Sequence, residues 1–453
     1  MADIAGFPYY EVEFTKDGKI FDQHQAGQIL DAVAAGTITD LFVVSHGWNN
    51  DMAEARSLYR ELFARVRTAL GSGTPAGLAG RQFAVLGIFW PSKRFADSEL
   101  IPSGFAASVH DTAAQNAVLQ NELENLKGEN GFDHPDADRK LEEAKALVPR
   151  LETSTDAQNR FVDIMRELFP GGDDLEEKIP GQFMRDPGSD ILTRLKDPLA
   201  GEDDLVAPEA GTGRATSMGG ISLRPPSDGE AAGLGDFLNG IKQGARNLLN
   251  FTTYYTMKKR AGTVGGNGVN ALLRALREKK GDLKIHLIGH SFGGRLVTSA
   301  VNGAAGRDQL KVNTMTLLQA AFSHNGFSDD YDGKGARGFF HGVVQNGNVT
   351  GPILISHSVH DKAVGIAYPL ASRIVGESAS MLGDASDLFG GIGRNGAQHT
   401  RQRVVGNLLP AGGSYQFQGG RLYNLNAERF IKGHSDICKP EVAHAILCAV
   451  ATS

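Results

Sequence analysis

Short apolar runs alternate with stretches of helical periodicity over most of the chain. The apolar runs predict buried strands at Leu41–Val44, Arg81–Trp90, Leu283–Ile288, Thr314–Gln319, Pro352–His357 and Arg421–Leu425. Helical spacing or helix-start signals predict helices at Gln25–Ala35, Met52–Leu70, Gly293–Asn302 and from Pro440 onward. Buried strands that alternate with helices are typical of a mostly parallel sheet covered by helices. The pattern therefore predicts an α/β fold.

The first strands carry a hairpin signal. Tyr9–Phe14 and Lys19–Phe21 are strand-like and are joined through Lys16-Asp17-Gly18. A short polar connection with glycine between two such runs favours a β-hairpin. We expect this hairpin to form an antiparallel edge of the sheet.

The pattern changes between Arg94 and about Thr263. Helical stretches are predicted near Ser108–Lys127, Pro135–Leu147 and Ala157–Phe169, and Pro170–Gly233 is rich in glycine, proline, aspartate and serine. Such a composition predicts a loop-like tract. The block is thus expected as a large, mainly helical insertion between core strands.

A second helical stripe follows that tract. It comprises Leu234, Leu238, Ile241, Ala245, Leu248, Thr252 and Tyr255. Lys242 and Arg246 lie off that face. The stripe predicts a helix that packs on the core or on the rest of the insertion. A lid or a membrane-contacting helix over the ligand crevice is the alternative interpretation.

Candidate chemistry begins at Gly289-His290-Ser291-Phe292-Gly293, directly after the strand Leu283–Ile288 and before a helix. G-x-S-x-G in this context predicts a tight strand-to-helix turn that exposes a serine hydroxyl at the edge of the sheet. Glycines at the flanking positions fit this turn because larger side chains would collide there. Ser291 is therefore the candidate nucleophile.

A serine nucleophile needs a base and an acid, and both are predicted downstream. Asp361 lies in the loop at the carboxyl end of the strand Pro352–His357, where a parallel sheet opens its ligand crevice. His434 follows the strand Arg421–Leu425 and precedes the last helix. The chain order Ser, Asp, His, with each residue after a strand, predicts a Ser291–Asp361–His434 triad.

Other residues could fill two of these roles. Asp329 and Asp330 are the alternative acids, and Asp436 is too close in sequence to His434 to be preferred. His399 and His444 are the alternative bases.

An acyl-transfer site also needs donors for the oxyanion. The strand Leu41–Val44 runs into Ser45-His46-Gly47-Trp48, and Gly47 lets the chain turn so that the Trp48 amide can face the nucleophile. The Phe292 amide, directly after Ser291, is the second candidate donor. His46, Gly47 and His290 are further candidates for substrate contact. The alternative for this turn is an ordinary strand exit, with Asn49 or Asp51 capping the next helix.

With the His-Gly-Trp turn and the Gly-His-Ser-Phe-Gly-Gly elbow, the chain resembles the α/β-hydrolase superfamily, and within it bacterial esterase- or lipase-like serine hydrolases. The resemblance covers roughly residues 38–95 and 263–453. It implies a mostly parallel twisted sheet flanked by helices, the triad and the oxyanion hole named above. It also implies three parts: residues 1–94 and 263–453 as the core, and residues 95–262 as an inserted cap or lid.

Composition agrees with a large globular enzyme. The 453 residues are 41% hydrophobic and 22% charged, and the net charge of -6 leaves no basic surface for nucleic acid. Neither a charged-then-apolar leader nor an apolar run long enough for a bilayer is visible, so we expect a cytoplasmic protein. Leaderless secretion and peripheral membrane contact stay open alternatives, and the oligomeric state is unknown.

Two cysteines and thirteen histidines suggest neither a disulfide framework nor a metal site. Cys438 and Cys448 are expected to be reduced, with Cys438 more often a packing residue than a catalytic one. His357 and His360 flank Asp361 closely, but their spacing matches no zinc signature. The glycine-rich stretch Gly383–Gly396 lacks the context of a phosphate loop. No cofactor and no metal are expected.

The predicted function is cleavage of carboxylic esters through an acyl-enzyme, with lipid or long-chain esters as a hypothesis. Amide or peptide hydrolysis and acyl transfer use the same triad and are the alternatives. A non-enzymatic binding scaffold is the alternative of a different class.

Overall fold

The computed structural model describes residues 2–73, 75–92, 112–128, 131–169, 181–197, 240–361, 364, 370–371, 373–374 and 389–453. These residues form one sheet of nine strands, in the order β1-β2-β4-β3-β5-β6-β7-β9-β8. The strands are β1 (Ala2–Ile4), β2 (Phe7–Glu13), β3 (Asp40–Ser45), β4 (Phe83–Phe89), β5 (Lys284–His290), β6 (Thr314–Leu318), β7 (Ile353–His357), β8 (Arg403–Asn407) and β9 (Leu422–Asn426). All neighbouring pairs are parallel except β1 with β2.

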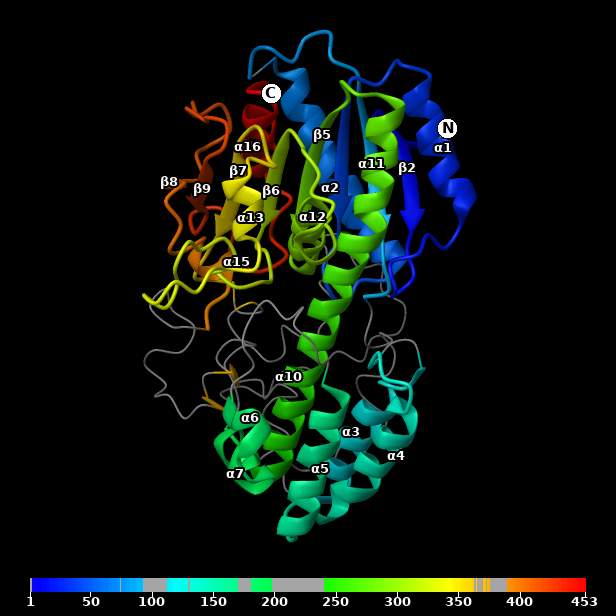
Figure 1. Ribbon diagram of the computed structural model, residues 1–453, viewed down its shortest axis with the longest axis vertical. Helices are drawn as coiled ribbons and strands as arrows, with labels where there is room; N and C mark the ends of the chain where they lie inside the picture. Colours follow the sequence, from blue (N-terminus) through cyan, green and yellow to red (C-terminus); the bar gives the residue numbers. More distant parts are fainter. Residues whose placement is uncertain are drawn as a thin grey trace, which may run out of the picture.

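Helices cover both faces of the sheet (Figure 1). The helices α1 (Gln23–Ala34), α11 (Asn270–Lys279) and α12 (Phe292–Asn302) contribute to one hydrophobic cluster. The helices α2 (Met52–Gly71) and α16 (Pro440–Ala451) contribute to a second one. The helix-flanked, mostly parallel sheet predicted from the sequence is confirmed.

Register brings several strand ends to one edge of the sheet. Ser45 of β3 pairs with Gly289 of β5, and Leu318 of β6 pairs with Ser356 of β7. Because these strands are parallel, the loops that follow them meet at the same edge. That edge holds the serine elbow, the His-Gly-Trp turn and the acid loop.

The antiparallel edge of the sheet differs from the predicted hairpin. It is β1 that pairs with β2, through Ala5 and Gly6, both with positive φ. Two successive left-handed residues make the turn that matches the twist of a hairpin. The prediction missed it because alanine seldom adopts that conformation. The expected strand Lys19–Phe21 was wrong and reduces to a single bridge between Phe14 and Ile20.

A helical bundle lies beyond the carboxyl edge of the sheet (Figure 1). It contains α3 (Thr112–Glu124), α4 (Ala137–Leu147), the 3-10 turn η2 (Val148–Arg150), α5 (Thr155–Leu168), α6 (Gly181–Arg185) and α7 (Gly188–Arg194). The predicted helices at 135–147 and 157–169 are confirmed. The loop-like prediction for Pro170–Gly233 was wrong for α6 and α7, and residues 170–180 and 198–233 of that tract lie outside the described residues.

Helix α10 (Gly240–Thr263) connects the bundle with the core (Figure 1). It continues through a π-helical segment, η3 (Val264–Val269), into α11 without a break. Glycine makes this path possible: a Cβ on Gly265 would lie 2.1 Å from the Leu296 carbonyl oxygen of α12. The predicted division of the chain at residues 262 and 263 thus falls inside a continuous helical run, and the division itself stays a prediction.

The apolar stripe predicted for this helix is only part of its buried surface. Lys242 and Arg246, placed off the stripe, are each only 1% exposed. Arg246 donates to Glu122 of α3 at 2.9 Å. Burial on all sides means that α10 packs as the central helix of the bundle. Leu234 and Leu238 of the stripe lie outside the described residues.

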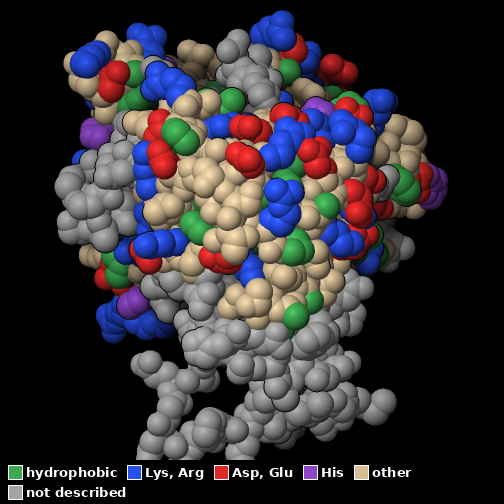
Figure 2. Space-filling model, turned by 90° about the horizontal axis from the view of Figure 1, so that it is seen from below, with side chains coloured by type: hydrophobic (Ala, Val, Ile, Leu, Met, Phe, Trp, Pro, Cys, Tyr) green, Lys and Arg blue, Asp and Glu red, His purple; other side chains and the backbone are tan. Residues whose placement is uncertain are grey.

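Ion pairs cover the outer surface of the bundle. Arg160 of α5 bonds Glu143 of α4, and Lys145 of α4 bonds Glu124 of α3. Acidic and basic side chains are interspersed on the face seen in Figure 2. Interspersed charges favour a solvated surface there. None of the described helices is both long enough and apolar enough to span a membrane.

A buried polar network ties the amino ends of the central strands together. Asp40, at the start of β3, accepts hydrogen bonds from Arg81, from Thr39 Oγ1 at 2.6 Å and from His286 Nε2 at 2.9 Å. The other ring nitrogen of His286 lies 2.9 Å from Thr314 Oγ1 of β6. Asp40, His286 and Thr314 resemble a catalytic triad in composition. Because they are buried at the edge opposite Ser291, we assign them a structural role.

Opposing effects act on the Asp40 carboxyl group. Burial alone would raise its pKa, but the hydrogen bonds from His286, Arg81 and Thr39 outweigh burial and hold the pKa well below its ordinary value. A lowered pKa in the folded state stabilises the fold above the unfolded-state pKa of about 3.9. That contribution is lost as the pH falls towards the folded-state value.

We expect Asp40→Asn to destabilise the protein strongly at pH 7, by about 3–5 kcal/mol, because it leaves Arg81, whose side chain is only 12% exposed, without its counter-charge. The difference between wild type and variant should shrink below about pH 4, where the aspartate of the unfolded chain is protonated. Urea unfolding at pH 7 and pH 3.5 measures this. The control is Asp136→Asn, from the exposed pair with Arg139, which should change stability by less than about 1 kcal/mol. A pH-independent loss for Asp40→Asn would contradict the assignment.

Candidate active site

Ser291 forms the turn between β5 and α12. Its φ of +55° is left-handed, which is strained for a residue other than glycine and costs about 1–3 kcal/mol. The main chain holds the turn from the side of β6: Ser291 N donates to Leu318 O at 3.1 Å, and Ala321 N donates to Ser291 O at 3.0 Å. This geometry is the strained strand-to-helix turn that the motif predicts.

The elbow is packed tightly against the end of β3. A Cβ on Gly293 would lie 2.1 Å from the Ser45 carbonyl oxygen. Only glycine fits at this distance without a shift of the backbone. The start of α12, and with it the Phe292 amide, is therefore fixed relative to the His-Gly-Trp turn.

The His-Gly-Trp turn lies directly against the candidate nucleophile. A Cβ on Gly47 would lie 2.5 Å from Ser291 Cβ and 3.0 Å from Ser291 Oγ. The next peptide unit is that of Trp48, the first candidate oxyanion donor. Phe292 is the first residue of α12, so its N–H has no acceptor within the helix. Both candidate donors thus belong to peptide units that adjoin the contact between Gly47 and Ser291.

His46 supports this turn from behind. Its ring is buried and stacks on Trp90 at 5.7 Å with an interplanar angle of 12°. Its amide donates to Tyr59 Oη at 2.8 Å, and its Nδ1 lies 3.0 Å from Gly47 O. Burial lowers the pKa of His46 to about 4, so the ring is neutral near pH 7. These contacts indicate that His46 shapes the loop. Asp51 caps α2, so the capping alternative for this region holds as well.

Asp361 and His434 are brought together by the fold. Both carboxylate oxygens of Asp361 lie 3.0 Å from His434 Nδ1, although the residues are 73 positions apart. The carboxylate is 0% exposed and the imidazole 13% exposed. A carboxylate can only accept, so Nδ1 carries the proton and Nε2 is left as the basic nitrogen. This is the orientation that a general base requires.

The same imidazole lies beside the serine elbow. The rings of His434 and His290 are 4.9 Å apart, and His290 is the residue before Ser291. His290 Nε2 donates to the carbonyl oxygen of His434 at 3.0 Å. His290 therefore anchors the His434 loop to the end of β5. Substrate contact by His46, Gly47 or His290 stays a prediction.

The alternative acids and bases have partners of their own. Asp329 accepts from Gln345 at 2.7 Å and lies 3.2 Å from His341, and with Asp330 and His399 it lines a surface pocket. His444 Nε2 lies 2.7 Å from Gly413 O. Asp436 pairs with Lys439 in the last loop. These groups are thus engaged by partners other than Ser291, Asp361 and His434, which favours the predicted triad over these alternatives.

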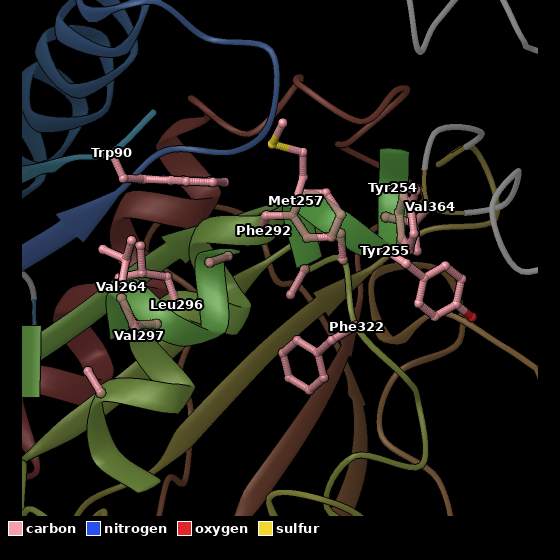
Figure 3. Packing of buried hydrophobic residues seen from close by; sticks show 14 of the residues in the cluster. Trp90, Tyr254, Tyr255, Met257, Val264, Phe292, Leu296, Val297, Phe322 and Val364 are labelled. Carbon is pink, nitrogen blue, oxygen red and sulfur yellow. The ribbon is translucent and has the colours of Figure 1, made fainter. Parts of the chain in front are cut away.

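An aromatic cluster adjoins the elbow. The ring of Phe292 lies 4.8 Å from Tyr254 of α10 and 5.9 Å from Trp48, and the Trp48 and Tyr254 rings are 6.3 Å apart. Figure 3 shows Tyr254, Met257 and Phe292 within the same buried cluster. Apolar surface from the connecting helix therefore reaches the site. Sequence analysis did not single out Tyr254, because its place beside the elbow depends on the tertiary path of α10.

Cysteine and metal chemistry gain no support from the described residues. Cys438 and Cys448 are free thiols, and burial raises the pKa of Cys438 to about 12. A thiol with such a pKa is a poor nucleophile at neutral pH. Within the described ranges, no group of three or more His, Cys, Asp or Glu side chains is arranged to hold a metal ion.

Gln319 is a further residue of the site that sequence analysis missed. It was predicted as the last residue of a strand, but it follows β6 and its carboxamide contacts Asp361. A signal was available: like Ser291 and Asp361, it is a polar residue after a buried strand that ends at the crevice. In the sequence, however, a glutamine at the end of a strand does not by itself indicate a functional role.

Comparison with known proteins gives one match. A family model described as an alpha/beta hydrolase of unknown function (DUF900) matches residues 222–387. The matched stretch includes Ser291 and Asp361 and ends before His434. No curated protein and no solved structure is significantly similar to the chain.

Proposed function

The chain belongs to the α/β-hydrolase superfamily, and from this premise we propose that it is a serine hydrolase that cleaves carboxylic esters through an acyl-enzyme. The observation that supports this most is the contact of both Asp361 oxygens with His434 Nδ1 at 3.0 Å, beside the strained Ser291 elbow. In this proposal Ser291 is the nucleophile, His434 the base and Asp361 the residue that orients the base.

The proposed reaction proceeds in two halves. Ser291 Oγ attacks the ester carbonyl carbon while His434 Nε2 takes the hydroxyl proton, and the oxyanion accepts hydrogen bonds from the Trp48 and Phe292 amides. Collapse breaks the bond to the alcohol oxygen, which receives the proton from His434. Water then attacks the acyl-enzyme with the same base, and the acid leaves as Ser291 Oγ regains its proton.

The aromatic cluster supports an apolar acyl group. Trp48, Tyr254 and Phe292 offer ring surface next to the nucleophile, and burial of an acyl chain contributes about 0.8 kcal/mol per methylene. Lipid or other long-chain esters are thus the proposed substrate class. We also propose that residues 95–262 form a cap over this site, between the core parts 1–94 and 263–453.

The experiment uses the wild-type protein and two reagents. We expect a fluorophosphonate probe to label it at Ser291, as located by peptide mass spectrometry, because only an activated serine attacks the phosphorus. We expect p-nitrophenyl esters to be hydrolysed, with kcat/KM rising from acetyl to longer acyl chains.

Each reagent has an outcome that would overturn its part of the proposal. A folded protein that neither reacts with the probe nor hydrolyses any ester would favour a non-enzymatic scaffold. Strong preference for the acetyl ester would reject the long-chain class but leave the hydrolase in place. Matched amides, and added alcohol as acceptor, separate ester hydrolysis from amidase and transferase activity.

A further inference from the structure

Gln319 occupies a strained position at the end of β6. Its φ is +44°, and its side chain is fully buried. Left-handed backbone at a residue other than glycine persists only where the surroundings enforce it.

The carboxamide bridges the acid to two neighbouring segments. Nε2 donates to Asp361 Oδ2 at 3.2 Å and to Gly393 O at 3.1 Å. Oε1 accepts from Ser356 Oγ of β7 at 2.9 Å. The reverse orientation would place the amide oxygen against two oxygen acceptors, so the contacts themselves fix which end is nitrogen.

Further bonds fix the bridge in place. The main-chain N–H of Gln319 donates back to Ser356 Oγ at 3.2 Å, so the two residues bond each other reciprocally. Gly393 N donates to Ala320 O, and Ser358 N donates to Gly393 O, each at 3.0 Å. The end of β6, the exit of β7 and α15 (Ile392–Asn395) thus form one hydrogen-bonded unit around the carboxylate.

Besides the imidazole and Gln319, Asp361 has one more donor among these contacts. Val364 N donates to Oδ1 at 3.0 Å, while Gln319 serves Oδ2. With one donor on each oxygen, rotation of the carboxylate would break at least one bond. A glutamine supplies its bond without adding charge, so the negative charge of Asp361 stays directed at His434.

We propose that Gln319 is a positioning residue for this site: by fixing the carboxylate of Asp361, it holds the His434 imidazole in its orientation with the proton on Nδ1. This inference rests on the proposed function for its kinetic readout. It predicts that Gln319 acts on turnover through the acid and the base, with little effect on substrate affinity.

The first variant removes the donor. Gln319→Leu keeps much of the side-chain volume but leaves Asp361 Oδ2 with one bond fewer. A hydrogen bond to a charged group is stronger than one between neutral groups, so we expect kcat for a p-nitrophenyl ester to fall about 10–100-fold with KM nearly unchanged.

The second variant changes the charge at constant shape. Gln319→Glu places a second carboxyl group about 3 Å from Asp361. Two buried carboxyl groups this close resist joint ionisation, but protonation of His434 favours it, because the imidazolium is attracted to the added negative charge. The pKa of His434 is therefore expected to rise. Because neutral His434 is the base, the acid limb of kcat/KM should move to higher pH, by about one unit.

Other charged groups near the unit stay unchanged in these variants. Among the described residues they include His290 at the end of β5, His357 in β7, His360 directly before Asp361, Arg394 of α15, which donates to Val359 O, and Asp436 in the His434 loop. A shift seen in Gln319→Glu therefore reports the new carboxyl group.

A matched control separates positioning from folding. Asn270 of α11 is also buried, and its carboxamide donates to Ala300 O at 2.7 Å and Asp308 O at 2.9 Å, on the side of the core away from the triad. Asn270→Leu should lower stability while kcat and the pH profile of the folded enzyme stay at wild-type values. A merely structural Gln319 would behave in the same way.

A second readout needs no turnover. Histidine-labelled protein allows the His434 ring to be titrated by NMR in wild type and in both Gln319 variants. We expect its pKa to rise in Gln319→Glu and to stay at the wild-type value in Asn270→Leu. If Gln319→Leu does not fold, the Glu variant decides alone.

The outcomes distinguish the two proposals. An inert wild type overturns the proposed function, and the NMR titration still tests Gln319. An active wild type whose kcat, acid limb and His434 titration are the same in both folded Gln319 variants overturns the positioning role and leaves the hydrolase intact.

Discussion

Replacing Ser291 by alanine is expected to lower kcat for an ester by about 10⁶-fold, the loss typical of a triad that acts as a unit. Without Oγ no acyl-enzyme forms, and only binding and oxyanion contacts remain to accelerate attack by water. Burst and steady-state kinetics with a p-nitrophenyl ester measure the effect, and substrate binding should persist.

The matched control is Ser299→Ala, which removes a second buried hydroxyl from the same helix, α12. It should keep kcat within about threefold of wild type because Ser299 lies two turns beyond the elbow. If Ser291→Ala retained more than a hundredth of the wild-type rate, another residue would have to be the nucleophile.

The second large effect is expected for Asp361→Asn, which should lower kcat by about 10⁴-fold. An asparagine in this place can donate to His434 Nδ1, which moves the ring proton to Nε2 and leaves no base towards Ser291. The shape of the site is preserved, so KM should change little. The measurement is kcat and KM for the same ester over a range of pH.

Asp329→Asn serves as the control and also tests the alternative acid after β6. Its carboxylate bonds His341 and Gln345 at a surface pocket, so we expect turnover close to that of wild type. A larger loss in Asp329→Asn than in Asp361→Asn would exchange the roles of the two aspartates.

Local signals predicted most of the strands and helices, and they also selected the candidate residues. The elbow followed from one motif in its strand-to-helix context, and Asp361 and His434 followed from their places after strands. Their mutual contact at 3.0 Å joins positions far apart in the sequence. What each residue does in catalysis stays a prediction that the variants test.

Features that depend on tertiary contacts could not be predicted from the sequence. Ala5 and Gly6 form a hairpin turn although alanine is not a turn residue, because pairing of β1 with β2 enforces the conformation. Gln319 carries no motif, and its proposed role depends on three partners that come from β7, from the loop after β7 and from α15. The burial of Lys242 and Arg246 reflects neighbours that surround α10, which periodicity along one helix cannot reveal.

The continuous helical run from α10 through η3 to α11 connects the bundle mechanically with the candidate site. Tyr254 lies partway along this helical run, and its ring contacts Trp48 and Phe292. Gly265 lets the run pack closely against α12. Because a helix resists bending, a tilt at the far end would shift those rings or strain the π-helical joint. The position of the aromatic rings beside Ser291 would then depend on how the distant helices of the bundle pack.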